Sequence, residues 1–133
     1  MGMGLDQFKR RNLRSALREL RIARKHDPEN LDILNSLGLI LHQLGEIDEA
    51  LKVYTEALRE NPDAPETNNN IGVLYLDLKQ YKKAIWHFQL AIKDPMYKTP
   101  GLAFSNMGFA YYQLGQKMKG LTIIKKAISD QPG

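Results

Sequence analysis

Apolar residues recur along the chain at the spacing expected for one face of an α-helix. Between residues 31 and 44 they stand three or four positions apart, at Leu34, Leu37, Leu41 and Leu44. Because an α-helix has 3.6 residues per turn, this spacing gives the helix one dry face and one wet face. The same pattern predicts helices over residues 13–26, 31–44, 48–60, 66–78, 82–93, 101–114 and 118–130, and one at 5–10 that stands alone or merges with the next.

Short signals mark where these helices begin and end. Asn30 and Thr99 precede helical patterns and are N-cap candidates, since their side chains accept hydrogen bonds from the free N–H groups of a first turn. Gly45 and Gly115 follow helical patterns and suit the left-handed residue that often ends a helix. The sequence therefore predicts an all-α fold of short helices joined by tight turns.

The helices form pairs because the whole pattern repeats. Leu37-Gly38 recurs as Ile71-Gly72 and Met107-Gly108, with spacings of 34 and 36 residues. A small residue follows each glycine by twelve positions, an aromatic residue or Ile by sixteen, and Ala by nineteen: Ala50, Ala84 and Gly120; Tyr54, Phe88 and Ile124; Ala57, Ala91 and Ala127. The small residues let two antiparallel helices approach closely, so we expect Gly38, Gly72 and Gly108 at equivalent helix contacts.

A helix-turn-helix unit of about 34 residues with this pattern resembles the tetratricopeptide repeat (TPR). The resemblance covers nearly the whole chain and implies a single TPR domain. Its parts are a partial repeat at 1–30 and repeats at 31–64, 65–100, with a two-residue loop insertion, and 101–133. The implied fold is a right-handed α-solenoid with a concave groove lined by the first helix of each repeat.

The resemblance also assigns groove positions within each first helix. In this sequence the expected peptide-binding residues are Asn35, Leu39, His42, Asn69, Asn70, Val73, Leu76, Ser105, Asn106, Phe109 and Tyr112. No Lys or Arg occupies the groove positions, which disfavours the TPR function of clamping a C-terminal carboxylate. Asn70 and Asn106 either hold a peptide backbone through an amide donor and acceptor or bridge neighbouring helices of the scaffold.

A narrower resemblance lies in the loop where the repeat is lengthened. Asp94-Pro95-Met96-Tyr97 is followed by Thr99-Pro100 and then by Leu102-Ala103 and Asn106-x-Gly108. This segment resembles the TPR proteins of type IV pilus biogenesis and stability, the PilF/PilW pilotin family. The resemblance implies an adaptor on the periplasmic side of the outer membrane that helps a secretin channel assemble. The alternatives are a general cytoplasmic TPR adaptor and a TPR region of a larger protein such as a glycosyltransferase.

Two further surfaces are candidates for contacts. Trp86 occupies a convex position that is normally polar, where it either forms an exposed patch with Met96 and Tyr97 or packs under the loop of residues 94–100. In the last helix, Ile123 has no clear place in the apolar stripe. An uncovered end of this kind predicts self-association through the C-terminal helix.

Composition and charge narrow the functional classes. The chain has 133 residues, of which 43% are hydrophobic and 26% charged, and it has no Cys, which excludes disulfides and Cys-ligated metals. No apolar run is long enough to span a membrane, and we expect no membrane insertion by this chain. The net charge of +4 combines a basic segment at 1–26 with an acidic one at 32–66. Without a nucleic-acid motif, the basic segment is typical of a solvated helix face, and nucleic acid is not a predicted partner.

The sequence offers no apparatus for catalysis. His26, His42 and His87 have no second ligand at metal-binding spacing, and no nucleotide-binding loop, nucleophile elbow or zinc motif occurs. His42 and His87 are interpreted as hydrogen-bonding surface or groove residues. We therefore expect a non-enzymatic scaffold that needs no metal or cofactor and binds a protein or peptide partner.

Overall fold

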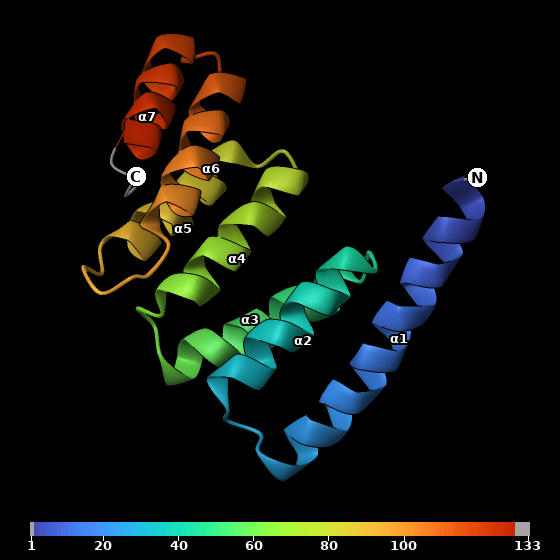
Figure 1. Ribbon diagram of the computed structural model, residues 1–133. Coiled ribbons are helices and arrows are strands. Elements are labelled where there is room, and N and C mark those ends of the chain that lie inside the picture. The colour runs from blue at the N-terminus through green and yellow to red at the C-terminus, as the bar shows by residue number, and fades with distance from the viewer. Residues whose placement is uncertain (1, 130–133) are drawn as a thin grey trace. The chain divides into compact units, whose positions relative to one another are not determined.

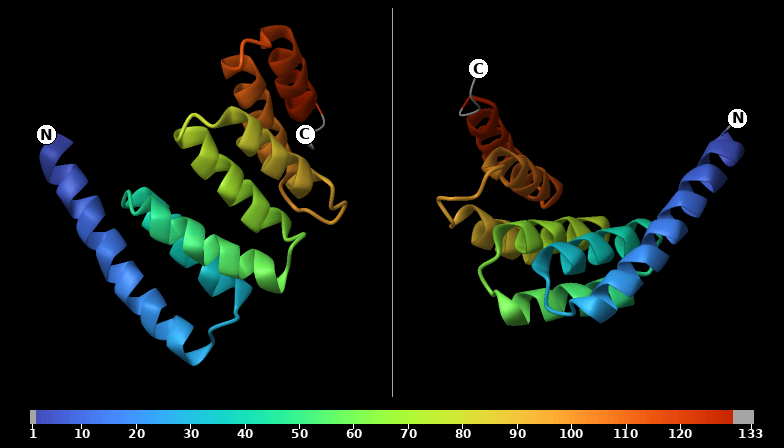
Figure 2. Two further views of the ribbon diagram at one scale, coloured as in Figure 1. Left: turned by 180° about the vertical axis from the view of Figure 1, so that it is seen from behind. Right: turned by 60° about the horizontal axis from the view of Figure 1, so that its bottom comes forward.

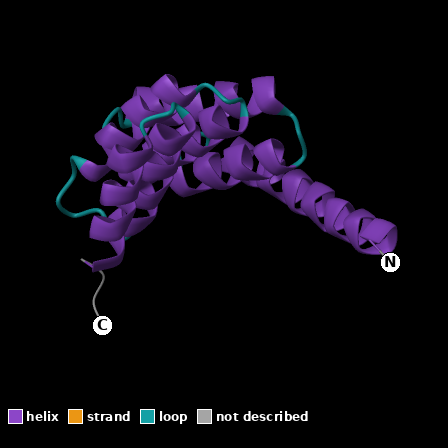
Figure 3. Ribbon diagram, turned by 90° about the horizontal axis from the view of Figure 1, so that it is seen from above, coloured by secondary structure: helices purple, strands orange, loops and turns teal. Residues whose placement is uncertain are grey.

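The protein folds into short α-helices joined by tight turns. The computed structural model describes residues 2–129, apart from the side chains of residues 2–6 and 8, and has no strand within that range (Figure 1, Figure 3). Its helices are α1 (Gly2–His26), α2 (Leu31–Gln43), α3 (Ile47–Glu60), α4 (Pro65–Asp77), α5 (Tyr81–Ile92), α6 (Pro100–Gln113) and α7 (Lys117–Ser129). The predicted all-α class is confirmed, and the first two predicted helices merge into α1.

The chain divides into two compact units at residues 1–62 and 63–133. The first unit contains α1, α2 and α3, and the second contains α4 to α7. Helices that follow one another within a unit pack side by side and run antiparallel, and the first turns of α1 extend past the end of α2 (Figure 2). The division lies two residues from the predicted repeat boundary after residue 64.

The helix ends show which of the predicted signals act. Asn30 caps α2 through its Oδ1 atom, which accepts a hydrogen bond from the Ile33 N–H at 3.1 Å, as predicted. Thr99 stands at the N-cap of α6, as predicted, but its side chain makes no capping hydrogen bond. Gly45 and Gly115 adopt the predicted left-handed conformation, at φ 83° and 92°. The equivalent residue after α4 is Lys79, which takes φ 60° despite its Cβ.

The core of the first unit is built around one glycine and one aromatic ring. A Cβ at Gly38 in α2 would lie 2.3 Å from Cε1 of Tyr54 in α3, so the missing side chain makes room for the ring. Tyr54 is fully buried, and its hydroxyl has no hydrogen-bond partner among the described residues. Burial raises the pKa of this phenol well above its ordinary range.

The second unit repeats this arrangement once and then changes it. A Cβ at Gly72 in α4 would lie 2.4 Å from Cε1 of Phe88 in α5. Between α6 and α7, however, a Cβ at Gly120 would lie 2.4 Å from the backbone oxygen of Gly108. The expectation of equivalent glycine contacts is confirmed in position. Ile123, which had no place in the sequence pattern, packs against the core cluster of this unit.

Candidate protein-binding surfaces

Helix α6 is apolar on two opposite faces. Ala103, Met107 and Ala110 are buried on one face. The predicted groove residues lie on the other face, where Leu102 is 55% exposed, Phe109 is 45% exposed and Tyr112 is also exposed. Ser105 and Asn106 are half-buried between them. A surface helix packs against the core through one apolar face, so the fold does not require the apolar residues on the exposed face of α6.

The predicted groove residues of α4 divide between surface and core. Asn70 is half-buried, and α4 contacts α6 within the second unit. Val73 and Leu76 are half-buried against the core cluster, so they expose only part of their surface. Asn69 is buried, and its Oδ1 atom has no hydrogen-bond partner among the described residues. Asn69 is therefore part of the scaffold rather than of an open surface.

In the first unit, α2 carries the other three predicted residues. Leu39 is exposed and His42 is half-buried, whereas Asn35 is buried. Burial of Asn35 removes most of its amide from contact with a ligand. Asn35 and Asn69 hold equivalent positions 34 residues apart, and both are interior residues.

The second unit also contains a polar pair inside the packed region. Nδ1 of His87 in α5 lies 3.0 Å from Oδ1 of Asn68 in α4, and the Asn68 amide donates to the Ala64 carbonyl oxygen at 3.1 Å. Because that bond fixes the Asn68 oxygen toward His87, Nδ1 must carry the donated proton. The His87 ring stacks on Tyr75 with centroids 5.6 Å apart. Burial lowers the pKa of His87.

Sequence reasoning missed this pair and described His87 as a surface or groove residue. A usable signal was present, because the residues at the two equivalent positions in the other repeats are all apolar. They are Leu34 with Val53 and Phe104 with Ile123. Two apolar positions that turn polar in the same repeat indicate that the two side chains meet.

The predicted convex patch is only partly assembled. Trp86 is 61% exposed and Met96 is 82% exposed, so Trp86 is not covered by the loop as the alternative had it. Tyr97 is 7% exposed and packs against Ala91 and Ala103, which removes it from the surface. The pKa of Tyr97 is raised by burial, with a smaller contribution from the charge of Glu66, while its hydrogen bond with Thr99 lowers it. Tyr97 thus anchors the loop in which Met96 is exposed.

Two ion pairs link α1 to α3 in the first unit. Nη2 of Arg21 lies 2.7 Å from Oε2 of Glu49, and Arg24 pairs with Glu56.

The described residues hold no group of three or more His, Cys, Asp or Glu side chains suited to a metal ion. None of the described helices has the length and apolar character required to cross a membrane. The candidate surfaces are therefore the apolar face of α6 and the charged face of α1.

Comparison with known proteins identifies the repeat. The family model described as "Tetratricopeptide repeat" matches residues 1–65 and 43–98. Tetratricopeptide repeat protein 21B of Xenopus laevis is 32% identical over 98 residues, which cover 72% of this chain and 7% of that protein. This relative thus contains a similar segment within a far longer chain.

Solved structures show the same fold. The crystal structure of PilW, described as a widely conserved type IV pilus biogenesis factor, is similar with a TM-score of 0.86 and 28% identity, covering 98% of this chain and 60% of PilW. Pseudomonas aeruginosa PilF has a TM-score of 0.85 and 24% identity, covering 96% of this chain and 58% of PilF. The chain thus spans about three fifths of the length of these two proteins.

Proposed function

Because the chain belongs to the tetratricopeptide repeat family, whose members are scaffolds for protein contacts, we propose that it binds a segment of a partner protein without catalysing a reaction. The binding surface is the face formed by α4 and α6 in the second unit, with Asn70, Asn106, Phe109 and Tyr112 as its contact residues. In the first unit, the exposed Leu39 of α2 is a separate candidate contact. The family resemblance supports the scaffold role.

The exposed apolar face of α6 is the observation that carries this proposal. Leu102 and Phe109 are large, lie on the same face and are about half exposed, although the opposite face of α6 already fills the core. Soluble proteins rarely keep such surface unless something binds it. The half-buried amides of Asn70 and Asn106 supply hydrogen-bond donors and acceptors for a peptide backbone beside these apolar contacts.

A paired pull-down tests the proposal. The protein carrying Asn70→Ala with Phe109→Ala should lose specific partners that the unchanged protein retains, as read by quantitative mass spectrometry. Trp86→Ala is the control, because Trp86 is also an exposed aromatic residue but lies on α5, outside the proposed face. Partners lost equally from both variants, or lost only when the circular dichroism signal of the helices also falls, would contradict a binding face on α4 and α6.

We also propose that the partner belongs to a type IV pilus assembly system. The loop Asp94-Pro95-Met96-Tyr97 and the likeness to PilW at 28% identity support this assignment. Deletion of the gene in its native host should then reduce surface pili, with rescue by the unchanged gene but not by the Asn70→Ala, Phe109→Ala variant. Normal piliation after deletion would favour an adaptor role in another complex.

A second copy of this chain is the partner that we propose for α7. Ile128 is 64% exposed and Leu121 is also exposed, whereas the equivalent residues of α5 are covered, Ile85 in the core cluster and Ile92 against it. We expect sedimentation to show concentration-dependent association that Leu121→Lys with Ile128→Glu abolishes. Thr122→Lys with Ser129→Glu, the same charge changes at exposed polar positions of α7, should leave it intact. Association that survives the first variant would place the contact elsewhere.

A further inference from the structure

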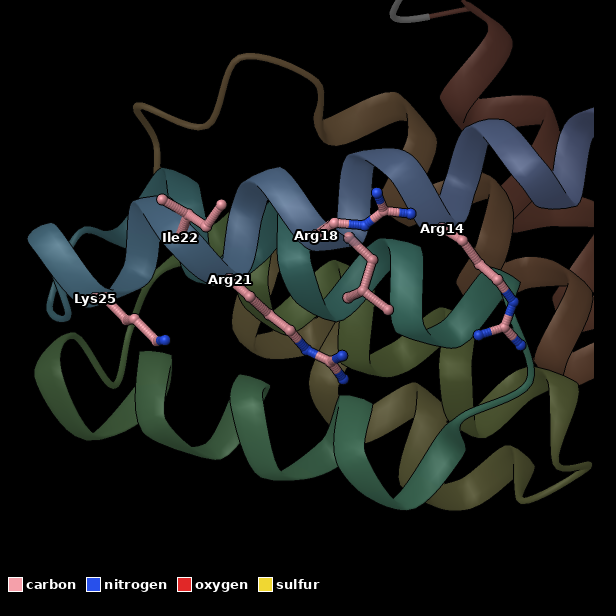
Figure 4. Close-up of a pocket in the computed structure, with 6 residues that line it drawn as sticks. Arg14, Arg18, Arg21, Ile22 and Lys25 are labelled. Carbon is pink, nitrogen blue, oxygen red and sulfur yellow. The ribbon is translucent and has the colours of Figure 1, made fainter.

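Helix α1 presents a line of cationic side chains along one face. Arg14, Arg18, Arg21 and Lys25 follow one another at spacings of four, three and four residues, and all four are exposed. With Leu17 and Ile22 they line a shallow cavity of about 380 Å³ (Figure 4). At 1.5 Å per residue the line is about 16 Å long. We call these four cationic residues the basic stripe.

The basic stripe is only partly neutralised within the molecule. Arg21 pairs with Glu49, but Arg14, Arg18 and Lys25 have no ion-pair partner among the described residues. Two like charges four positions apart, as at Arg14 and Arg18, destabilise a helix. The stripe therefore opposes helix formation where a mixed-charge face would support it.

The contact between α1 and α3 shows what kind of surface fits these cations. Glu49 and Glu56 stand seven residues apart on α3 and pair with Arg21 and Arg24, which are three residues apart on α1. Carboxylates on one face of a neighbouring helix thus already hold one edge of α1. Arg14, Arg18 and Lys25 continue the same charge pattern, but no described carboxylate pairs with them.

We propose that the basic stripe binds an acidic amphipathic helix of a partner protein. Carboxylates of the partner at spacings of four, three and four residues would match the four cations, since ionised side chains form the stronger hydrogen bonds. An aliphatic residue between them would cover Ile22, which is 54% exposed. This surface lies on α1 in the first unit, so it is separate from the face of α4 and α6 proposed above.

The geometry favours a helix over the two other anionic partners. A membrane surface calls for a broad apolar face beside the cations, but Ile22 is the only exposed large apolar residue in the lining, because Leu17 is buried. A nucleic acid presents a helical track of phosphates, whereas the stripe is a straight line interrupted by an aliphatic side chain. A straight row of carboxylates on a helix matches it in both length and charge.

A peptide titration tests the proposal on the full chain. The probe is a synthetic helical peptide with Glu at four-three-four spacing and Leu between, labelled with fluorescein and followed by anisotropy. A peptide of the same composition, scrambled so that its Glu residues do not share a face, should bind at least about tenfold more weakly, equivalent to about 1.4 kcal/mol. Arg14→Glu with Arg18→Glu should weaken binding of the first peptide by a similar factor.

Two further variants separate the stripe from general charge attraction. Lys125→Glu with Lys126→Glu makes the same charge change on α7, where both residues are exposed, and should bind the acidic peptide unchanged. A peptide with Lys in place of each Glu should bind the Arg14→Glu, Arg18→Glu variant and not the original protein. If that variant loses helical signal, Arg14→Gln with Arg18→Gln replaces it and should also weaken acidic-peptide binding.

Three results would overturn the proposal. The scrambled peptide could bind as well as the helical one, or the α7 variant could lose as much binding as the α1 variant. Either result would mean that the acidic peptide binds through the net charge of the protein rather than through the basic stripe. In the third, vesicles containing phosphatidylserine, or a DNA duplex, would bind through Arg14 and Arg18 more tightly than the acidic peptide, which would assign the stripe to another class of partner.

Discussion

The two helix pairs of the second unit share one repeat pattern but close their contacts differently. In α4 and α5, Gly72 leaves room for the ring of Phe88. In α6 and α7, a Cβ at Gly108 would meet Ile124 Cγ1 at 2.6 Å and the backbone oxygen of Gly120 at 2.7 Å. Gly72 and Gly108 hold equivalent positions in the repeat. Gly72 makes room for an aromatic ring, whereas Gly108 lets two helix backbones approach closely. A repeat pattern preserves the position of a small residue, not the reason for it.

The pairs also differ in what they bury beside these glycines. His87 and Asn68 form a polar contact in α4 and α5, where α6 and α7 have Ile123 and Phe104. Both pairs keep a lysine over a tyrosine ring, with Lys83 Nζ 5.5 Å from the Tyr75 centroid and Lys119 Nζ 4.4 Å from that of Tyr111. The cation–π contact is thus common to both pairs, whereas the polar contact is specific to one.

The largest effect is expected at the close backbone approach. Gly120→Ala should lower the free energy of unfolding by about 3 kcal/mol, at the upper end for overpacking, because the new Cβ meets backbone atoms that cannot rotate away. Urea denaturation measures the loss. Ala84 holds the equivalent position in α5, so Ala84→Gly is the control and should cost only about 1 kcal/mol. Equal losses at both positions would remove the distinction between the pairs.

Substitution of Gly72 should cost less than substitution of Gly120, because the new Cβ would meet the side chain of Phe88 rather than backbone atoms. Gly72→Ala should destabilise by about 1–3 kcal/mol, and Gly72→Leu should lower the melting temperature further. Adding Phe88→Leu to Gly72→Ala should recover part of the loss, which a double-mutant cycle of denaturation measurements detects. Strict additivity of the two changes would mean that the ring does not occupy the space left by Gly72.

Substitutions at the ends of α4 and α6 should change the free energy of unfolding by smaller amounts, and one of them should increase it. Lys79→Gly should stabilise the protein by about 0.5–1 kcal/mol, because glycine adopts the positive φ of this position without a Cβ clash. Gly115→Ala, at the equivalent position after α6, should destabilise by a similar amount. Thermal melts of the two variants test the pair, and a loss of stability in Lys79→Gly would contradict the backbone assignment.

The smallest effect is a pH dependence confined to the polar pair. The pKa of His87 is lowered from its ordinary value of 6.5 by burial, so the unfolded state binds more protons just below that pH. The contribution of neutral His87 is fully present above pH 6.5 and is lost as the pH falls toward its lowered value. Stability measured from pH 8 to 5 should decline less in His87→Gln, and parallel curves would exclude His87 as the source.

Much of the fold followed from the sequence because the repeat imposes it three times. The glycines, the Asn30 cap and the left-handed Gly45 and Gly115 were all predicted, since each depends on local geometry. The left-handed Lys79 escaped prediction because nothing in its own chemistry marks it. Its conformation can be predicted only by aligning the repeats, because Lys79 stands where the other two repeats have Gly45 and Gly115.

The candidate surfaces were less predictable because exposure depends on what neighbouring segments cover. Phe109 and Tyr112 are exposed as a groove face requires, while Asn35 and Asn69 are buried at positions expected to face a ligand. Tyr97 was one candidate for an exposed patch with Trp86 and Met96, but it is buried against Ala91 and Ala103. Spacing predicts which face of a helix a residue occupies, and it does not predict how deep that face lies.

The buried hydroxyl of Tyr54 gives the first unit a spectroscopic reporter of its own. It is the only tyrosine within residues 1–62, and burial raises the pKa of its phenol well above its ordinary range. In an alkaline titration followed by ultraviolet absorbance, we expect Tyr54 to ionise only as its unit opens. Burial also raises the pKa of Tyr97 in the second unit, so the titration uses a Tyr97→Phe variant. The late part of its curve then reports the unfolding of residues 1–62 without any added label.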